Sequence, residues 1–246
     1  MPDERNVRPG PAGVATGRLG RVDLAAGEVR DDAAPFALGG VVVLVTLALV
    51  SRQAGWETLG HTIWWLWLVA AAPYGLLSVM LPLGISRLVA HARRRDVVIG
   101  LLALVWLFNM LGVGLLVASL VAHSGHEMTG GQLLLSGGTV WLTNVVVFGL
   151  TFWELDGGGP VARAIANGPA TPDFRFPQHE SPALAPPEWA PRLWDYVYVS
   201  FTNSIAFSPT DAMPFTRRAK ALMAAESTLS MIAVLLVTAR AVNVLN

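Results

Sequence analysis

The sequence predicts an all-α, polytopic membrane protein with about five transmembrane helices and a short re-entrant or interfacial helix before the last of them. Its residues are 53% hydrophobic and only 14% charged, whereas soluble domains carry about 25% charged residues. Several apolar runs approach the roughly 20 residues that a helix needs to cross a bilayer. A further apolar segment, residues 193–207, is too short to do so. The lipid bilayer is therefore the first partner that the sequence predicts.

The chain divides into four regions by composition. A polar N-terminal tail is expected to be disordered because it cannot bury enough apolar surface. Four transmembrane helices follow, then a Gly/Pro-rich linker without a visible helix or strand period, and finally a pore-loop-like segment with the last transmembrane helix. These regions are residues 1–35, 36–153, 154–192 and 193–246, and the expected spans are 36–50, 62–85, 97–122, 133–153 and 221–244.

Composition and motifs exclude several functional classes. The formal net charge is zero, so there is no general basic field for nucleic acid. The absence of cysteine excludes disulfides, thiolate chemistry and cysteine-based metal sites. His123 and His126 share a loop without a visible third ligand, which does not predict a metal site. No nucleophile–base motif or phosphate-binding loop occurs. We therefore expect neither enzymatic activity nor a cofactor.

Arginine placement predicts the orientation of the spans. Arg87, Arg93, Arg94 and Arg95 lie between the second and third spans, while the next loop, 123–132, has no arginine or lysine. Basic loops stay on the cytoplasmic side. We therefore expect a multi-pass protein of the plasma or inner membrane, with the N-terminus in the cytoplasm and the C-terminus outside.

The segment 193–207 is the most informative part of the chain. It is apolar or aromatic along most of its length, and polar residues gather towards its end. A helix of about 14 residues reaches only about 21 Å, which fits a half-membrane insertion or a helix lying at the interface. Its polar side chains are hydroxyls and amides rather than Lys or Arg, which favours a water-lined cavity over a headgroup surface. Both interpretations remain open from the sequence.

The sequence SFTNSIAFSPTDAMP and the helix after it resemble the pore-helix, filter and inner-helix unit of tetrameric potassium-type channels. The resemblance implies a homo-oligomer, with a tetramer as one arrangement. Together with WELDGGGP, the same segment resembles a family of bacterial integral-membrane proteins that has no assigned function. The positions that carry the resemblance to the channels are Tyr198, Ser200, Phe201 and Thr202 for the pore helix, 208–211 for the end of the filter, and Pro214 and Arg217 before the inner helix.

The filter glycines of that channel family are absent here. Pro209 fixes its own φ, so a ring of backbone carbonyls selective for potassium is not expected. Side chains would line a wider pore instead, and Asp211 is the best single functional candidate, although aspartate is also a common turn residue. The candidate pore residues are Thr202, Asn203, Ser204, Phe207, Ser208, Pro209, Thr210 and Asp211.

Three polar residues fall within expected spans or close to their ends. Glu226 lies near the start of the last span, where an acidic residue is functional by default, although pairing with Arg218 or Lys220 is an equal alternative. Asn109 and Asn144 lie mid-span, where polar side chains usually link helices.

Two functions fit these observations. The first is a channel-like protein that passes cations or small solutes with poor potassium selectivity. The alternative is a non-conducting scaffold or assembly protein that retains a pore-like fold. In that case the Pro-rich linker would bind a protein partner, because extended proline-rich segments dock at low entropic cost. A membrane enzyme is the weakest option, since no catalytic pair or metal cage can be named.

Overall fold

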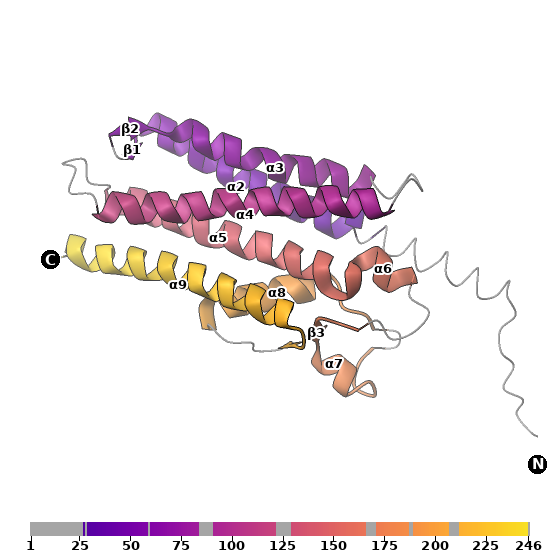
Figure 1. Cartoon of the computed structure of the whole chain (residues 1–246). Helices are drawn as coiled ribbons and strands as arrows, with labels where there is room; N and C mark the ends of the chain where they lie inside the picture. Colours follow the sequence, from indigo (N-terminus) through magenta and orange to yellow (C-terminus); the bar gives the residue numbers. More distant parts are fainter. Residues whose placement is uncertain are drawn as a thin grey trace, which may run out of the picture.

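The computed structural model describes residues 27, 29–58, 60–83, 91–121, 129–165, 171–186, 189–206 and 212–245. Within these ranges, five long helices form a bundle (Figure 1). Each is long and apolar enough to cross a membrane, which confirms the predicted all-α membrane fold. They are α2 (Ala34–Gln53), α3 (Trp64–Leu83), α4 (His91–Val121), α5 (Gly130–Leu155) and α9 (Arg217–Leu245).

The first helix starts earlier than its apolar run. A π-helical turn, Val29–Ala33, leads directly into α2, so helical structure begins inside the region expected to be a polar tail. The turn packs against α3, and Ala33 is completely buried. Tertiary contacts therefore order a segment whose own composition favours disorder. Residues 1–26 of the expected tail lie outside the described residues.

The bundle has two ends that differ in their connections (Figure 1). At one end, which we call the hairpin end, β1 (Glu57–Thr58) pairs antiparallel with β2 (His61–Thr62) between α2 and α3. The other end, the linker end, carries α6 (Pro160–Ile165), β3 (Phe174–Arg175) and α7 (Pro177–Glu180). α2 begins at the linker end and α9 finishes at the hairpin end.

α5 is the central helix of the bundle. It packs against α2, α4, α8 and α9. In its most apolar stretch 67% of the residues are buried, against 22% for α9. α9 therefore packs on the bundle along a narrow face and leaves side chains such as Met231 and Leu235 exposed.

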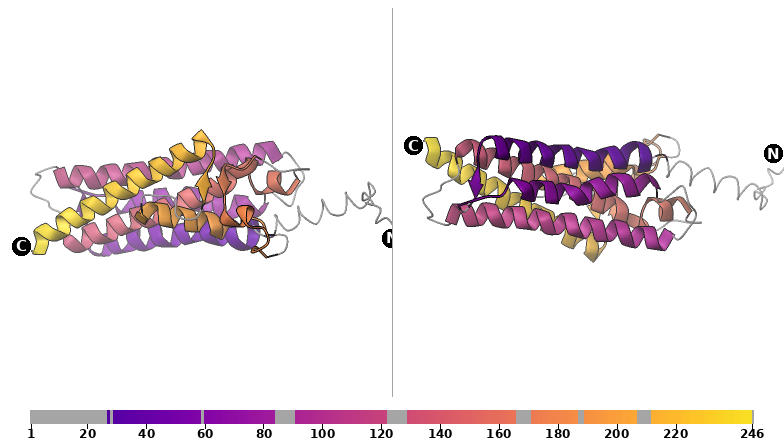
Figure 2. Two further views of the ribbon diagram at one scale, coloured as in Figure 1. Left: turned by 90° about the horizontal axis from the view of Figure 1, so that it is seen from below. Right: turned by 90° about the horizontal axis from the view of Figure 1, so that it is seen from above.

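The short helix α8 (Leu193–Ala206) starts at the linker end and stops part-way along the bundle. At about 1.5 Å per residue, its 14 residues reach about 21 Å, against about 39 Å for the 26 residues of α5. After α8 the chain is back at the linker end, where β4 (Met213–Pro214) pairs antiparallel with β3. Both ends of the segment 193–214 thus lie at the same end of the bundle (Figure 2).

The linker is held on the bundle by aromatic side chains. Phe174 and Phe176 are buried, although they lie in the stretch expected to be irregular. The Phe174 ring lies 5.0 Å from that of Phe152, and the Phe176 ring lies 5.3 Å from that of Tyr196, between ring centroids. The Trp189 ring also packs edge-on against Phe176, with 5.9 Å between the ring centroids. The described linker therefore contains short helices and one strand that contribute to the core.

The contact between α5 and α8 depends on Gly149. A Cβ atom at this position would lie 3.1 Å from the Cα of Val197. We expect Gly149→Ala to lower the free energy of unfolding by about 1 kcal/mol, because overpacking costs about 1–3 kcal/mol and the helix gains about 1 kcal/mol from alanine. Thermal unfolding of the purified protein in detergent measures this change.

Gly138→Ala is the matched control on the same helix. Nothing lies within 4 Å of a Cβ atom at Gly138, so this variant should be unchanged or more stable. Equal behaviour of the two variants would show that the α5–α8 contact is not tight.

Candidate functional site

The two faces of α8 have the opposite polarity to that of a helix in a water-soluble protein. Its exposed face is apolar and aromatic, whereas its buried face carries hydroxyl and amide groups. Such a helix is suited to an apolar environment outside and a polar one inside. The exposed residues include Trp194, Tyr198, Phe201 and Ile205, and the buried polar ones are Tyr196, Ser200, Asn203 and Ser204.

The buried face of α8 closes on the carboxyl group of Glu226 in α9. Glu226 is 0% exposed. The Ser200 hydroxyl donates to Oε1 of Glu226, and the Asn203 amide donates to Oε2 at 2.7 Å. The same Asn203 amide reaches the carbonyl oxygen of Met223 at 3.0 Å, and Ser227 donates to Oδ1 of Asn203 at 3.1 Å. Two helices are therefore joined through one acidic side chain.

Hydrogen bonds continue from this carboxyl group into the middle of the bundle. The Asn144 amide donates to the hydroxyl of Ser230 at 2.8 Å and to the carbonyl oxygen of Glu226 at 3.4 Å. The Asn109 amide donates to Oδ1 of Asn144 at 3.0 Å, and Thr143 donates to Oδ1 of Asn109 at 3.1 Å. The two asparagines link α4, α5 and α9, as their mid-span positions predict. We call Asn109, Thr143, Asn144, Ser200, Asn203, Glu226 and Ser230 the polar core.

The described residues include three of the eight candidate pore residues. Asn203 and Ser204 are buried on the inner face of α8. Thr202 donates to the carbonyl oxygen of Tyr198 in its own helix, at 2.8 Å. Phe207, Ser208, Pro209, Thr210 and Asp211 lie outside the described residues.

The polar core contains no counter-charge for Glu226. Within the described residues its carboxyl oxygens bond only to a hydroxyl and an amide, and Arg218 pairs with Asp173 instead. A buried carboxylate without a partner charge is costly. A proton or a metal cation would remove that cost. The Ser200 hydroxyl and Nδ2 of Asn203 face the carboxyl group as hydrogen-bond donors, so the ligands for a hard cation here would be the carboxyl oxygens themselves. No group of three or more His, Cys, Asp or Glu side chains suited to a metal occurs in the described ranges.

A second cluster, at the linker end, was missed by the sequence reasoning. Asp156 follows α5 directly and is 1% exposed. Its Oδ1 accepts from the backbone N–H groups of Asp173, at 2.5 Å, and Phe174, at 3.1 Å. Its Oδ2 accepts from the hydroxyl of Tyr196 at 2.5 Å. One carboxylate thus joins the end of α5, the linker and the first turns of α8.

Asp173 extends this cluster to α9. Its Oδ1 accepts from the hydroxyl of Thr216 at 2.5 Å, and its Oδ2 pairs with Arg218. Thr216 also accepts from the backbone N–H of Ala219 at 3.1 Å and so caps α9. We call Asp156, Asp173, Tyr196, Thr216 and Arg218 the Asp156 cluster.

The sequence signal for this cluster is WELDGGGP. Gly157, Gly158 and Gly159 all have positive φ, a conformation that glycine adopts at no steric cost. A Cβ atom at Gly159 would lie 2.9 Å from the carbonyl oxygen of Glu154. The glycines therefore let the chain turn tightly after α5 while Asp156 faces inward. The motif identifies the turn, but not the segment that Asp156 binds.

Comparisons with family models, with curated proteins and with solved structures found no match to this chain. The function is therefore inferred from the polar core and the Asp156 cluster alone.

Replacing Asp156 tests the role of its cluster. We expect Asp156→Asn to lower the free energy of unfolding by about 2–3 kcal/mol, because hydrogen bonds to charged groups contribute about 1.5–3 kcal/mol each. The linker should also become more sensitive to protease. Thermal unfolding and limited proteolysis in detergent measure the two effects.

Glu180→Gln is the control for this loss of charge. Glu180 forms an exposed ion pair with Arg175 at 3.5 Å, and such pairs contribute at most about 1 kcal/mol. If both variants have the stability and protease resistance of the native chain, Asp156 does not hold the linker in place.

Proposed function

We propose that this integral membrane protein passes small cations through a channel-like module formed by α8 and α9, with poor selectivity for potassium. The observation that supports this proposal most strongly is the inward-facing polar surface of α8, closed on the buried carboxyl group of Glu226. The five apolar helices provide the membrane anchorage that such a function requires.

In this proposal α8 is re-entrant rather than interfacial. An interfacial helix turns its polar face towards water and headgroups. The exposed face of α8 instead carries Trp194, Tyr198, Phe201 and Ile205, which suits lipid or an apolar partner. The return of the chain to β4 at the linker end agrees with insertion from one side.

Glu226 is the proposed cation-binding group. Its neighbours Ser200 and Asn203 are uncharged, so an ionised carboxylate there needs a cation beside it. Exchange between a proton and a metal cation at this carboxyl group would be the elementary step of passage. Asp211, which lies outside the described residues, is proposed from the sequence alone as a second acidic group of the module.

A homo-oligomer, with a tetramer as one arrangement, fits the proposal. Only 22% of the most apolar stretch of α9 is buried within one chain, so another copy has an apolar face of α9 to cover. The N-terminus is proposed to be cytoplasmic, because the connection between α3 and α4 contains Arg87 and leads into Arg93–Arg95 in the first turns of α4, which makes this end of the two helices the most basic. The linker end then faces the cytoplasm.

One observation favours the alternative, a non-conducting scaffold. Leu184 is 87% exposed, although the linker around it is anchored by buried Phe174 and Phe176. In this alternative a protein partner covers the Leu184 side chain, which the linker itself leaves exposed. The complete burial of Glu226 also agrees with a closed, structural polar core.

Cation flux into liposomes tests the channel proposal. We expect liposomes that contain the purified protein to take up protons, sodium or potassium faster than empty ones under an imposed potential. Glu226→Gln should reduce the rate by at least about tenfold, because a hydrogen bond to a charged group contributes about 1.5–3 kcal/mol and tenfold is about 1.4 kcal/mol. Ion-sensitive dyes inside the liposomes measure the rate.

Thr228→Ala is the control on the same helix. Thr228 is exposed and donates to the carbonyl oxygen of Ala224 at 2.8 Å, so its replacement should leave the flux unchanged. Uptake no faster than in empty liposomes for all three ions would rule out the channel. Equal uptake by Glu226→Gln and the native chain would show that Glu226 does not take part in cation passage.

The scaffold alternative is tested at Leu184. Leu184→Asp should weaken binding of a stoichiometric partner about 10- to 100-fold, since burying a leucine contributes about 1.5–3 kcal/mol. Quantitative mass spectrometry of the tagged protein, purified from the membranes of its own cells, measures partner recovery. Ser181→Asp, which adds the same charge to an exposed position in the same turn, should retain the partner. Identical recovery with both variants would count against a partner site at Leu184.

A further inference from the structure

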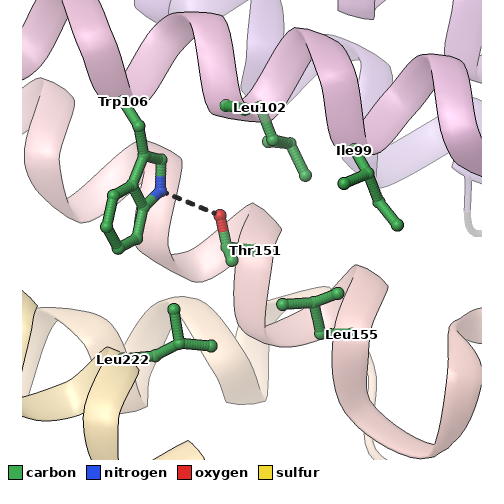
Figure 3. Close-up of a pocket in the computed structure, with 7 residues that line it drawn as sticks. Ile99, Leu102, Trp106, Thr151, Leu155 and Leu222 are labelled. Atoms are coloured by element: carbon green, nitrogen blue, oxygen red, sulfur yellow. Dashed lines mark hydrogen bonds between the residues drawn. The ribbon is translucent and has the colours of Figure 1, made fainter. Parts of the chain in front are cut away.

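An apolar crevice lies between α4, α5 and α9 towards the linker end (Figure 3). Its volume is about 300 Å³. Its two polar side chains satisfy each other, because Nε1 of Trp106 donates to Oγ1 of Thr151 at 3.3 Å. The remaining surface offers no hydrogen bonds from side chains. It is lined by Ile99, Leu102, Trp106, Thr151, Leu155 and Leu222, with exposed Ala103 on α4 as a further contact.

Two arginines lie one helical turn beyond this crevice, both towards the linker end. Arg95 precedes Ile99 by four residues on α4, and Arg218 precedes Leu222 by four residues on α9. Residues four apart share a helix face, so both arginines lie on the helix faces that line the crevice, one turn nearer the linker end. The side chain of Arg218 is 48% exposed although it pairs with Asp173.

Arg95 lacks an acceptor in the described structure. Its Nε is buried and has no hydrogen-bond partner among the described residues. Buried donors are nearly always paired. Because the charge of Arg218 is partly neutralised by Asp173, Arg95 carries the less compensated charge of these two arginines. An apolar crevice with two arginines one turn beyond it, one of which has an Nε without an acceptor, is complementary to an amphiphile with an anionic head.

We propose that this crevice binds one anionic phospholipid of the surrounding bilayer. The acyl chain occupies the crevice, and phosphate oxygens accept from Arg95 and Arg218, as in other basic pockets between transmembrane helices. If a methylene group takes about the volume of a water molecule, about 30 Å³, the crevice holds about ten. An apolar helix face from a second copy would cover the lining, but Arg95 also requires an acceptor, which the phosphate group of a lipid supplies.

This site is distinct from the polar core. Its lining includes none of the residues that bond Glu226, and it requires no conduction. A protein that fails the flux test can therefore still bind lipid here. A protein that conducts cations can likewise fail to bind lipid.

Native mass spectrometry of the full chain in detergent tests the proposal, with dioleoylphosphatidylglycerol and dioleoylphosphatidylcholine as the added lipids. We expect one molecule of phosphatidylglycerol to bind about fivefold or more tightly than phosphatidylcholine, and Arg95→Gln to remove most of that preference. Arg95→Lys should retain it, because the charge is kept. Ala103→Trp should weaken both lipids, because the indole ring fills the crevice.

Two controls match these variants. Arg52→Gln removes the same charge at the hairpin end, where Arg52 lies over the ring of Trp64. Leu111→Trp adds an indole ring to α4 two turns beyond Ala103. Both should bind phosphatidylglycerol as the native chain does. Equal binding of the two lipids, unchanged binding by Arg95→Gln and Ala103→Trp, or a dimer that Ala103→Trp dissociates would each overturn the proposal.

Discussion

The buried carboxyl group of Glu226 sets the arrangement of the helices around it. In an apolar environment every polar group needs a partner within the protein. The oxygens of Glu226 find theirs on α8, and its backbone carbonyl accepts from Asn144 on α5. Asn109 then continues the chain of bonds to α4. Sliding any of these helices by one turn would leave several buried groups unpaired, so the polar core fixes register as well as position.

The Asp156 cluster acts at the opposite end of α8 and complements the polar core. Tyr196 and Asn203 lie on one face of this helix, and each is bonded to a carboxyl group of a long helix or its end. α8 is thus held at two points about two turns apart. The space between those points is filled by apolar packing, with Gly149 of α5 against Val197. These contacts therefore fix the position of α8, although an isolated helix of this length would not be stable in water.

Much of this fold could be predicted from the sequence. The apolar runs gave the five helices, and the length of the apolar segment before the last span gave α8 nearly to the residue. The mid-span positions of Asn109 and Asn144 indicated links between helices. These inferences succeed because span length and polar burial depend on local composition.

The long-range contacts could not be predicted in this way. The sequence allowed Glu226 to pair with Arg218 or Lys220, whereas Arg218 binds Asp173 and Glu226 binds α8. Asp156 belongs to a visible glycine motif, but its two backbone partners lie 17 and 18 residues further on, in a proline-rich stretch, and Tyr196 lies 40 residues further on in α8. The partners of Glu226 and Asp156 leave no periodic pattern in the sequence, because they depend on which elements meet in the folded structure. The anchoring of the linker by Phe174 and Phe176 was missed for the same reason.

The order of α8 and α9 along the chain has a consequence for biosynthesis. Ser200 and Asn203 emerge from the ribosome before Glu226, their partner, has been made. α5 alone offers α8 a groove and one carbonyl acceptor, that of Val145. α8 therefore reaches its final place only after translation of α9. A chain truncated before Arg217 would present an unsatisfied polar helix to the quality-control machinery of the cell, even though four complete spans precede it.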